Sequence, residues 1–166
     1  MKEEQFKVLK TMSEATSRMD LNMFAMKMNL SPNQTLQQIQ ELAKEGFLKR
    51  VGNGYGVTER GKAALKAFTP VPEEMSFHFY LGNNQPADLN SQTLEEFYRV
   101  IKQVSAVSLE FHLYRGDFEL WLKEACKEPE LANEIGDIKA TGLNGEKLRA
   151  EILKILDSKY GIQELI

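Results

Sequence analysis

Amide and hydroxyl side chains are concentrated in the stretch "SPNQTLQQIQELAK", residues 31–44. Asn and Gln side chains can each make two hydrogen bonds to an adenine edge, and Thr can contact a thymine methyl group. We expect a helix here whose apolar residues Leu36, Ile39 and Leu42 face the core. The outward side chains would then be those of Asn33, Gln34, Thr35, Gln37, Gln38, Glu41 and Lys44. Such a face is suited to reading base edges in a DNA groove.

Cationic residues that could neutralise phosphates follow this stretch. Lys49 and Arg50 precede the tight turn "GNG" at 52–54, and Arg60 and Lys62 come after it. Asn53, at the tip of the turn, could reach a minor groove or a phosphate. Phosphate neutralisation supplies most of the affinity of non-specific DNA binding. Because the amide-rich helix itself contains few cations, we expect one copy to bind weakly and a homodimer on a two-fold site to bind well.

Local signals define the elements that would position these side chains. Ser31 is a good helix N-cap, Pro32 suits the first helical position, and Gln34 completes a capping box. Before it, apolar periodicity predicts a first helix around residues 6–12 and a second that Asp20 would cap. After it, "FLKRV" and "YGVT" are predicted strands that flank the turn, and Thr58 is a predicted cap of a fourth helix.

The stretch "LSPNQTLQQIQELAKEGFLKRVGNGYGVTERGKAAL" resembles the core of prokaryotic, archaeal-type winged helix-turn-helix transcription regulators. The resemblance covers about residues 20–68 and implies that the third helix enters the major groove while the two strands form the wing. It implies contacts to double-stranded DNA from Ser31, Asn33, Gln34, Thr35, Gln37, Gln38, Lys44, Lys49, Arg50, Asn53, Arg60 and Lys62. Arg18 and Lys27 are further candidates for backbone contacts. Winged helices also bind proteins, so an adaptor for another protein of the transcription or replication machinery is the alternative.

The charge of the chain changes sign near "AFTPVPEEM". Residues 1–68 have a net charge of +4 and residues 69–166 one of −7. Together with Pro70 and Pro72, this change predicts a winged-helix domain over 1–69, a linker and aromatic arm over 70–90, and a small all-helical domain over 91–166. In the arm, "MSFHFYLG" is predicted to be a short strand or an extended segment that packs on a partner, and "NNQPADLNSQ" a loop. The predicted fold is therefore mainly α.

The acidic half offers no recognisable activity. Its stretch "VSLEFHLYRGDFELWLKEACKEPELANEIGDI" loosely resembles an uncharacterised helical domain of archaeal and bacterial proteins. We expect this domain to join two chains, to sense an effector, or to bind a protein partner. The aromatic stripe Phe111, Tyr114, Phe118 and Trp121 is predicted to be packing rather than an effector pocket.

Residues for catalysis or metal binding are few. The lone Cys126 cannot form an internal disulfide, and with two distant histidines it does not supply the three or four ligands of a zinc site. We therefore predict no catalytic residue, no cofactor and no metal. His112 could pair with Asp117 or another carboxylate, either as a core or interface histidine or as a pH-sensitive or ligand-binding group. A third hypothesis makes it part of a helical enzyme. No signal peptide and no apolar run of roughly 20 residues are evident, so we expect a cytoplasmic protein.

Overall fold

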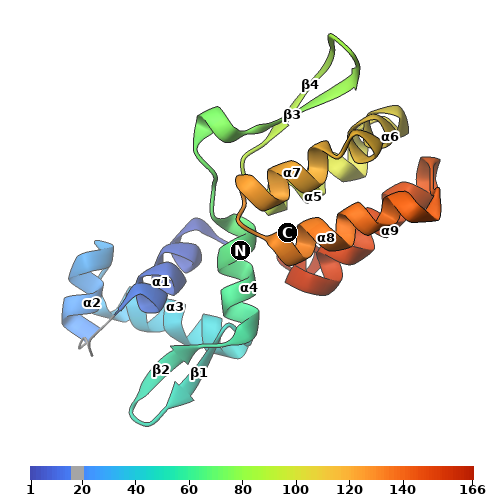
Figure 1. Ribbon diagram of the computed structural model, residues 1–166. Helices are drawn as coiled ribbons and strands as arrows, with labels where there is room; N and C mark the ends of the chain where they lie inside the picture. Colours follow the sequence, from blue (N-terminus) through green and yellow to red (C-terminus); the bar gives the residue numbers. More distant parts are fainter. Residues whose placement is uncertain (16–20) are drawn as a thin grey trace. The chain divides into compact units, whose positions relative to one another are not determined.

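The computed structural model describes residues 1–15 and 21–166 (Figure 1). These residues form nine α-helices, two antiparallel two-stranded sheets and a few short 3-10 turns, so the chain is mainly helical. They divide into two compact units. The first comprises Met1–Lys66 together with Glu164–Ile166, and the second comprises Ala67–Gln163. Asp20, the expected cap of the second helix, and Arg18 lie outside the described residues.

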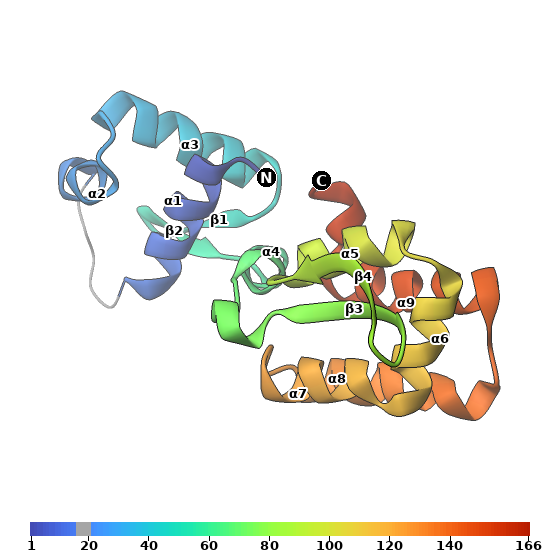
Figure 2. The same cartoon turned by 90° about the horizontal axis from the view of Figure 1, so that it is seen from above.

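The first unit is built from three helices, a hairpin and a fourth helix. In chain order these are α1 (Glu3–Glu14), α2 (Leu21–Met28), α3 (Pro32–Lys44), β1 (Leu48–Val51), β2 (Gly54–Val57) and α4 (Glu59–Phe68). Helix α1 contacts α3 on one side and β2 on the other, and α3 also contacts α2 and β1 (Figure 2). The core of this unit is formed by apolar residues of the four helices, of β1 and of the segment before it, among them Leu9, Phe24, Ile39, Leu42, Phe47, Leu48 and Ala64.

The beginnings of α3 and α4 are fixed by hydrogen bonds that the sequence predicts. Ser31 Oγ accepts from the Gln34 backbone N–H at 3.1 Å, while Gln34 Oε1 accepts from the Ser31 N–H at 3.0 Å, which confirms the capping box. Thr58 Oγ1 accepts from the Gly61 N–H at 3.0 Å and donates to the Gly46 carbonyl at 2.6 Å. Thr58 therefore caps α4 and also ties it to the chain segment that follows α3.

Strands β1 and β2 form a regular antiparallel hairpin. Leu48 lies opposite Val57, and Val51 lies opposite Gly54. The turn between them begins at Gly52, whose φ of +60° lies in the left-handed region that favours glycine. The tight turn predicted at 52–54 is thus confirmed.

The second unit combines a hairpin with five helices. Its elements are β3 (Phe77–Gly82), β4 (Gln85–Ser91), α5 (Leu94–Gln103), α6 (Ala106–Arg115), α7 (Asp117–Glu124), α8 (Pro129–Asp137) and α9 (Gly145–Tyr160). The long helix α9 contacts α5, α6 and α8, and α7 packs against α8. The hairpin lies over the helices, with β3 against α6 and β4 against α5 (Figure 2).

Residues 70–90 do not form a linker and arm, and the second domain is not all-helical, but of the two alternatives for "MSFHFYLG" the short strand is confirmed by β3. This segment contains the β3–β4 hairpin, which packs inside the second unit. The physical cause is the alternation of β3, which buries Phe77 and Phe79. The ring of Phe77 lies 4.9 Å from that of His112, 5.3 Å from that of Phe118 and 5.6 Å from that of Trp121, measured between centroids. The aromatic side chains of this strand thus form part of the core of their own unit, and the alternative of an extended segment that packs on a partner was wrong.

Strand β4 was predicted to be a loop because its sequence, "QPADLNS", is polar and has no apolar alternation. It pairs with β3 through backbone groups instead, with Phe77 opposite Ser91 and Gly82 opposite Gln85. The register shifts twice along the pair, so the pairing is irregular. Backbone pairing of this kind does not depend on an apolar pattern, which is why composition did not reveal it.

Candidate functional site

Helix α3 exposes most, but not all, of the side chains predicted to face outward. Ser31, Asn33, Gln34, Gln37 and Lys44 are exposed, as expected. Thr35, however, is completely buried, and its hydroxyl donates to the Ser31 carbonyl at 3.0 Å. Gln38 is half-buried, and its Oε1 is shielded from solvent and has no hydrogen-bond partner among the described residues. The predicted outward orientation was therefore wrong for Thr35 and only partly right for Gln38.

The cause is the rotational phase of the helix. The buried positions are Thr35, Ile39 and Leu42, whereas Leu36, expected in the core, is 38% exposed. A threonine can occupy a core position in a helix because its hydroxyl bonds to the carbonyl four residues earlier. A prediction that ranks leucine above threonine as a core residue consequently places the apolar face about one residue too far along the chain.

Correcting the phase adds one polar residue that sequence reasoning missed. Gln40 is exposed and follows Asn33 and Gln37 at spacings that place all three on one helix face, which Lys44 continues. We call Asn33, Gln37, Gln40 and Lys44 the polar stripe of α3. The amide of Gln37 donates to Glu41 Oε1 at 3.2 Å within the helix. Recognising Thr35 as a core residue would have revealed the stripe.

The hairpin β1–β2 and the start of α4 present the cations expected to contact phosphates. Lys49 and Arg50 are exposed on β1, and Asn53 is exposed in the turn. Arg60 forms an ion pair with Glu164 at 2.9 Å, and Lys62 forms one with Glu59 at 3.0 Å. Exposed ion pairs typically contribute less than about 1 kcal/mol, so a phosphate could replace either carboxylate.

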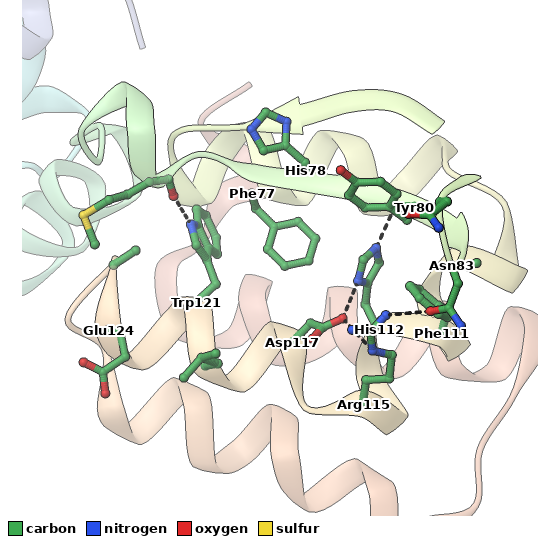
Figure 3. Close-up of a pocket in the computed structure, with 15 residues that line it drawn as sticks. Phe77, His78, Tyr80, Asn83, Phe111, His112, Arg115, Asp117, Trp121 and Glu124 are labelled. Carbon is green, nitrogen blue, oxygen red and sulfur yellow. Dashed lines mark hydrogen bonds and ion pairs between the residues drawn. The ribbon is translucent and has the colours of Figure 1, made fainter. Parts of the chain in front are cut away.

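The second unit contains a cavity of about 800 Å³ between strand β3 and helices α6 and α7 (Figure 3). Aromatic residues from both sides line it, namely Phe77 and Tyr80 of β3, Phe111 of α6 and Trp121 of α7. The expectation that the aromatic stripe is packing holds for the buried Phe118 and Trp121, although Trp121 also lines this cavity together with Phe111. It was wrong for Tyr114, which is exposed. The cavity depends on the β3–β4 hairpin, and the sequence did not indicate it because the second strand was predicted to be a loop.

His112 is a structural residue of the cavity wall. It is 3% exposed, and its Nε2 accepts from the Tyr80 backbone N–H at 2.8 Å. Its Nδ1 must therefore carry the proton, and it donates to Asp117 Oδ2 at 2.9 Å, as the sequence suggested. Burial lowers the pKa of His112, and Asp117 opposes this shift only in part. The neutral ring joins β3 to the α6–α7 corner through both nitrogens.

His78, the other histidine, is exposed on β3. The part of the chain that the structure describes contains no group of three or more His, Cys, Asp or Glu side chains that could hold a metal ion. Within the same residues, no helix combines the length and apolar character needed to cross a bilayer.

Comparison with known proteins places the chain in a family. No curated protein and no solved structure matches the chain. A family model described as "Family of unknown function (DUF5752)" matches residues 59–157, from the start of α4 to near the end of α9. Because this match covers more than half of the chain, the protein belongs to that family.

Proposed function

We propose that the protein is a DNA-binding transcription regulator whose first unit is a winged helix-turn-helix. In this proposal α3 lies in the major groove, and the β1–β2 hairpin is the wing that contacts the backbone or the minor groove. The order of elements supports the proposal, because three helices are followed directly by a two-stranded hairpin. The observation that carries it is the polar stripe of α3, which leads in sequence to the exposed cations of β1.

The exposed side chains divide into base-reading and phosphate-binding roles. Asn33, Gln37 and Gln40 carry amides that can bond base edges, above all adenine. Lys44, Lys49 and Arg50 can neutralise phosphates, and Asn53 can enter the minor groove or bond a phosphate. Arg60 and Lys62 would also bind phosphates, in place of their present carboxylate partners. The hydrogen bonds between Ser31 and Gln34 stabilise the first turn of α3, which would contact the DNA backbone. Thr35 is buried and would stabilise the helix rather than contact DNA.

A modest number of phosphate contacts implies that two copies act together. About 3–5 phosphate contacts per copy would give weak binding at physiological salt. A homodimer on a two-fold symmetric site would double the number of phosphate contacts. Once one copy is bound, the other copy would be held at a high effective concentration near its half-site. The acidic second unit, with a net charge of −6 over residues 67–163, is expected to avoid the duplex and to serve dimerisation or sensing.

A second candidate function is an adaptor that binds another protein of the transcription or replication machinery. It is favoured by large apolar side chains that are exposed on the helices of the first unit, namely Leu21, Met23 and Met26 on α2 and Leu36 on α3, with Met26 at 81%. Exposed apolar side chains of this kind are common in protein-binding surfaces.

Selection of genomic DNA fragments by the purified full-length chain distinguishes the two functions. The DNA-binding proposal predicts enrichment of related fragments, and the adaptor predicts no enrichment even at low salt. The double variant Gln37→Ala/Gln40→Ala should lose sequence preference yet retain weak binding, because it removes amides and leaves every cation in place. Gln103→Ala, which removes an exposed amide at the end of α5, serves as the control. Unchanged preference in the double variant would contradict the assigned role of the polar stripe.

A further inference from the structure

We propose that the cavity between β3 and α7 binds a small organic cation, an amine with an apolar body. The cavity volume of about 800 Å³ lies within the range of about 300–1,000 Å³ that is typical of small-molecule sites. This binding site is separate from the proposed DNA contacts, because every residue that lines it belongs to the second unit.

The apolar body of the ligand would lie against a wall that is already in place. Phe77 and Trp121 form this wall, and the indole N–H of Trp121 donates to the Met75 carbonyl at 2.7 Å. That bond joins α7 to the segment before β3 and holds the indole ring in one orientation (Figure 3). At the mouth, Leu120 is 62% exposed although it lines the cavity. A bound apolar group would cover it and remove its side chain from water.

The charges around the cavity favour a cation over an anion. Helix α7 places Asp117, Trp121 and Glu124 at spacings of four and three residues, so one face presents an aromatic ring between two carboxylates. His112 donates to Asp117 as a neutral ring and therefore does not cancel its charge. An ammonium group would meet carboxylates and aromatic faces, both of which attract cations.

The one cation of the lining does not reverse this balance. The guanidinium of Arg115 is centred 4.5 Å from the ring centroid of Phe111, and its Nη1 donates to Asn83 Oδ1 at 3.4 Å. Figure 3 shows Arg115 and Asn83 at the opposite end of the cavity from Glu124. Arg115 Nε lies 3.7 Å from Asp117 Oδ2, the same oxygen that accepts from His112. The net charge of the unit, −6, would also steer cations toward it.

The chain contains one tryptophan, Trp121, so its fluorescence reports directly on this cavity. Phenethylamine and phenylpropionate form a matched pair of probes, since both carry a phenyl ring on a two-carbon arm and differ in the sign of charge. Titration of the full-length protein with phenethylamine should change the Trp121 emission saturably at millimolar concentrations or below, and phenylpropionate should not. Equal or preferential binding of phenylpropionate, or no saturable change with either probe, would overturn the proposal.

Variants at the rim locate the binding. Glu124→Gln should weaken phenethylamine binding about threefold, as expected for loss of a partly solvated ion pair. Glu110→Gln removes a carboxylate of α6 that does not line the cavity and should leave the affinity unchanged. Leu120→Arg should abolish binding of the amine, whereas Leu120→Gln should only weaken it. Leu120 is exposed, so both variants should fold, and unchanged affinity in Glu124→Gln and Leu120→Arg together would place the amine elsewhere.

Discussion

The guanidinium of Arg60 and the carboxylate of Glu164 lie 2.9 Å apart, although 104 residues separate them in the chain. Arg60 is in the first turn of α4, and its guanidinium is also centred 4.9 Å from the ring centroid of Phe47. Glu164 belongs to the short segment after α9 that is part of the first unit. The Glu164 carboxylate is thus already paired with Arg60, one of the cations proposed to bind phosphates. A DNA phosphate would have to compete with Glu164 for this guanidinium.

Replacing this carboxylate should strengthen DNA binding. Glu164→Gln leaves Arg60 available to a phosphate and removes a repulsive charge, so we expect the affinity for mixed-sequence duplex to rise about twofold to fivefold at low salt. Fluorescence anisotropy with a labelled duplex measures the change. Glu146→Gln, which removes the exposed partner of Arg149 in the second unit, is the matched control and should have no effect. Equal or weaker binding by Glu164→Gln would remove Arg60 from the proposed interface.

A substitution at Thr35 tests which face of α3 is buried. Thr35→Val keeps the buried shape and removes a hydroxyl whose acceptor, the Ser31 carbonyl, also receives the Thr35 backbone N–H. The free energy of unfolding should therefore change by less than about 1 kcal/mol, and DNA sequence preference should not change. Urea denaturation and fragment selection provide the two measurements. If Thr35→Val altered base preference as strongly as Gln37→Ala, Thr35 would have to face the duplex after all.

The second unit should lose stability in mild acid because of His112. Burial lowers the pKa of this imidazole in the folded state, so the unfolded chain binds the proton more readily. The stability that the neutral ring contributes to the folded state is fully present above the ordinary histidine pKa of about 6.5. It is lost as the pH falls from there toward the folded-state pKa. Protonation would also place an Nε2–H against the Tyr80 N–H, two donors facing each other.

Urea unfolding followed by Trp121 fluorescence between about pH 7 and pH 5 measures this loss, with a limiting slope of about 1.4 kcal/mol per pH unit. His112→Gln can still accept from Tyr80 and does not titrate, so the slope in this pH range should become smaller. An NMR titration that found the His112 pKa above that of an unfolded peptide would reverse the sign and refute the account of this bond.

Gly61 tests the packing of α4 on the hairpin. A Cβ added here would lie 2.4 Å from the Phe47 carbonyl oxygen, which is backbone and cannot move alone. Gly61→Ala should therefore destabilise the protein by about 1–3 kcal/mol despite its better helix propensity. At Gly54 an added Cβ would meet only the Val51 carbonyl oxygen at 3.9 Å, so Gly54→Ala is the control and should have a small effect. Thermal unfolding compares the two, and similar melting temperatures would contradict the packing described.

The features that could be predicted from the sequence are those fixed within a few residues. The box formed by Ser31 and Gln34, the cap at Thr58 and the turn at Gly52 each follow from hydrogen bonds or backbone conformations that local residue types determine. The phase of α3 was wrong because the tertiary core accepts Thr35 in preference to Leu36. Periodicity cannot decide that choice when both residues could be buried.

The cavity could not be predicted because it depends on contacts distant in sequence. The backbone of Tyr80 meets His112, and the indole of Trp121 meets the carbonyl of Met75, which lies 46 residues earlier. These contacts require the β3–β4 hairpin, whose second strand has no apolar pattern. The pairing of His112 with Asp117 was foreseen because the two residues are close in sequence, but the occupation of the second ring nitrogen was not.

The salt dependence of binding to a mixed-sequence duplex tests the central claim most directly. For the full-length protein we predict that the logarithm of the association constant falls linearly with the logarithm of salt concentration, with a slope of about −3 or steeper. Lys49→Gln/Arg50→Gln should reduce the magnitude of that slope by about 2, because each cation accounts for roughly one phosphate. Absence of measurable binding at low salt, or a slope that this double variant leaves unchanged, would contradict DNA binding through α3 and the wing.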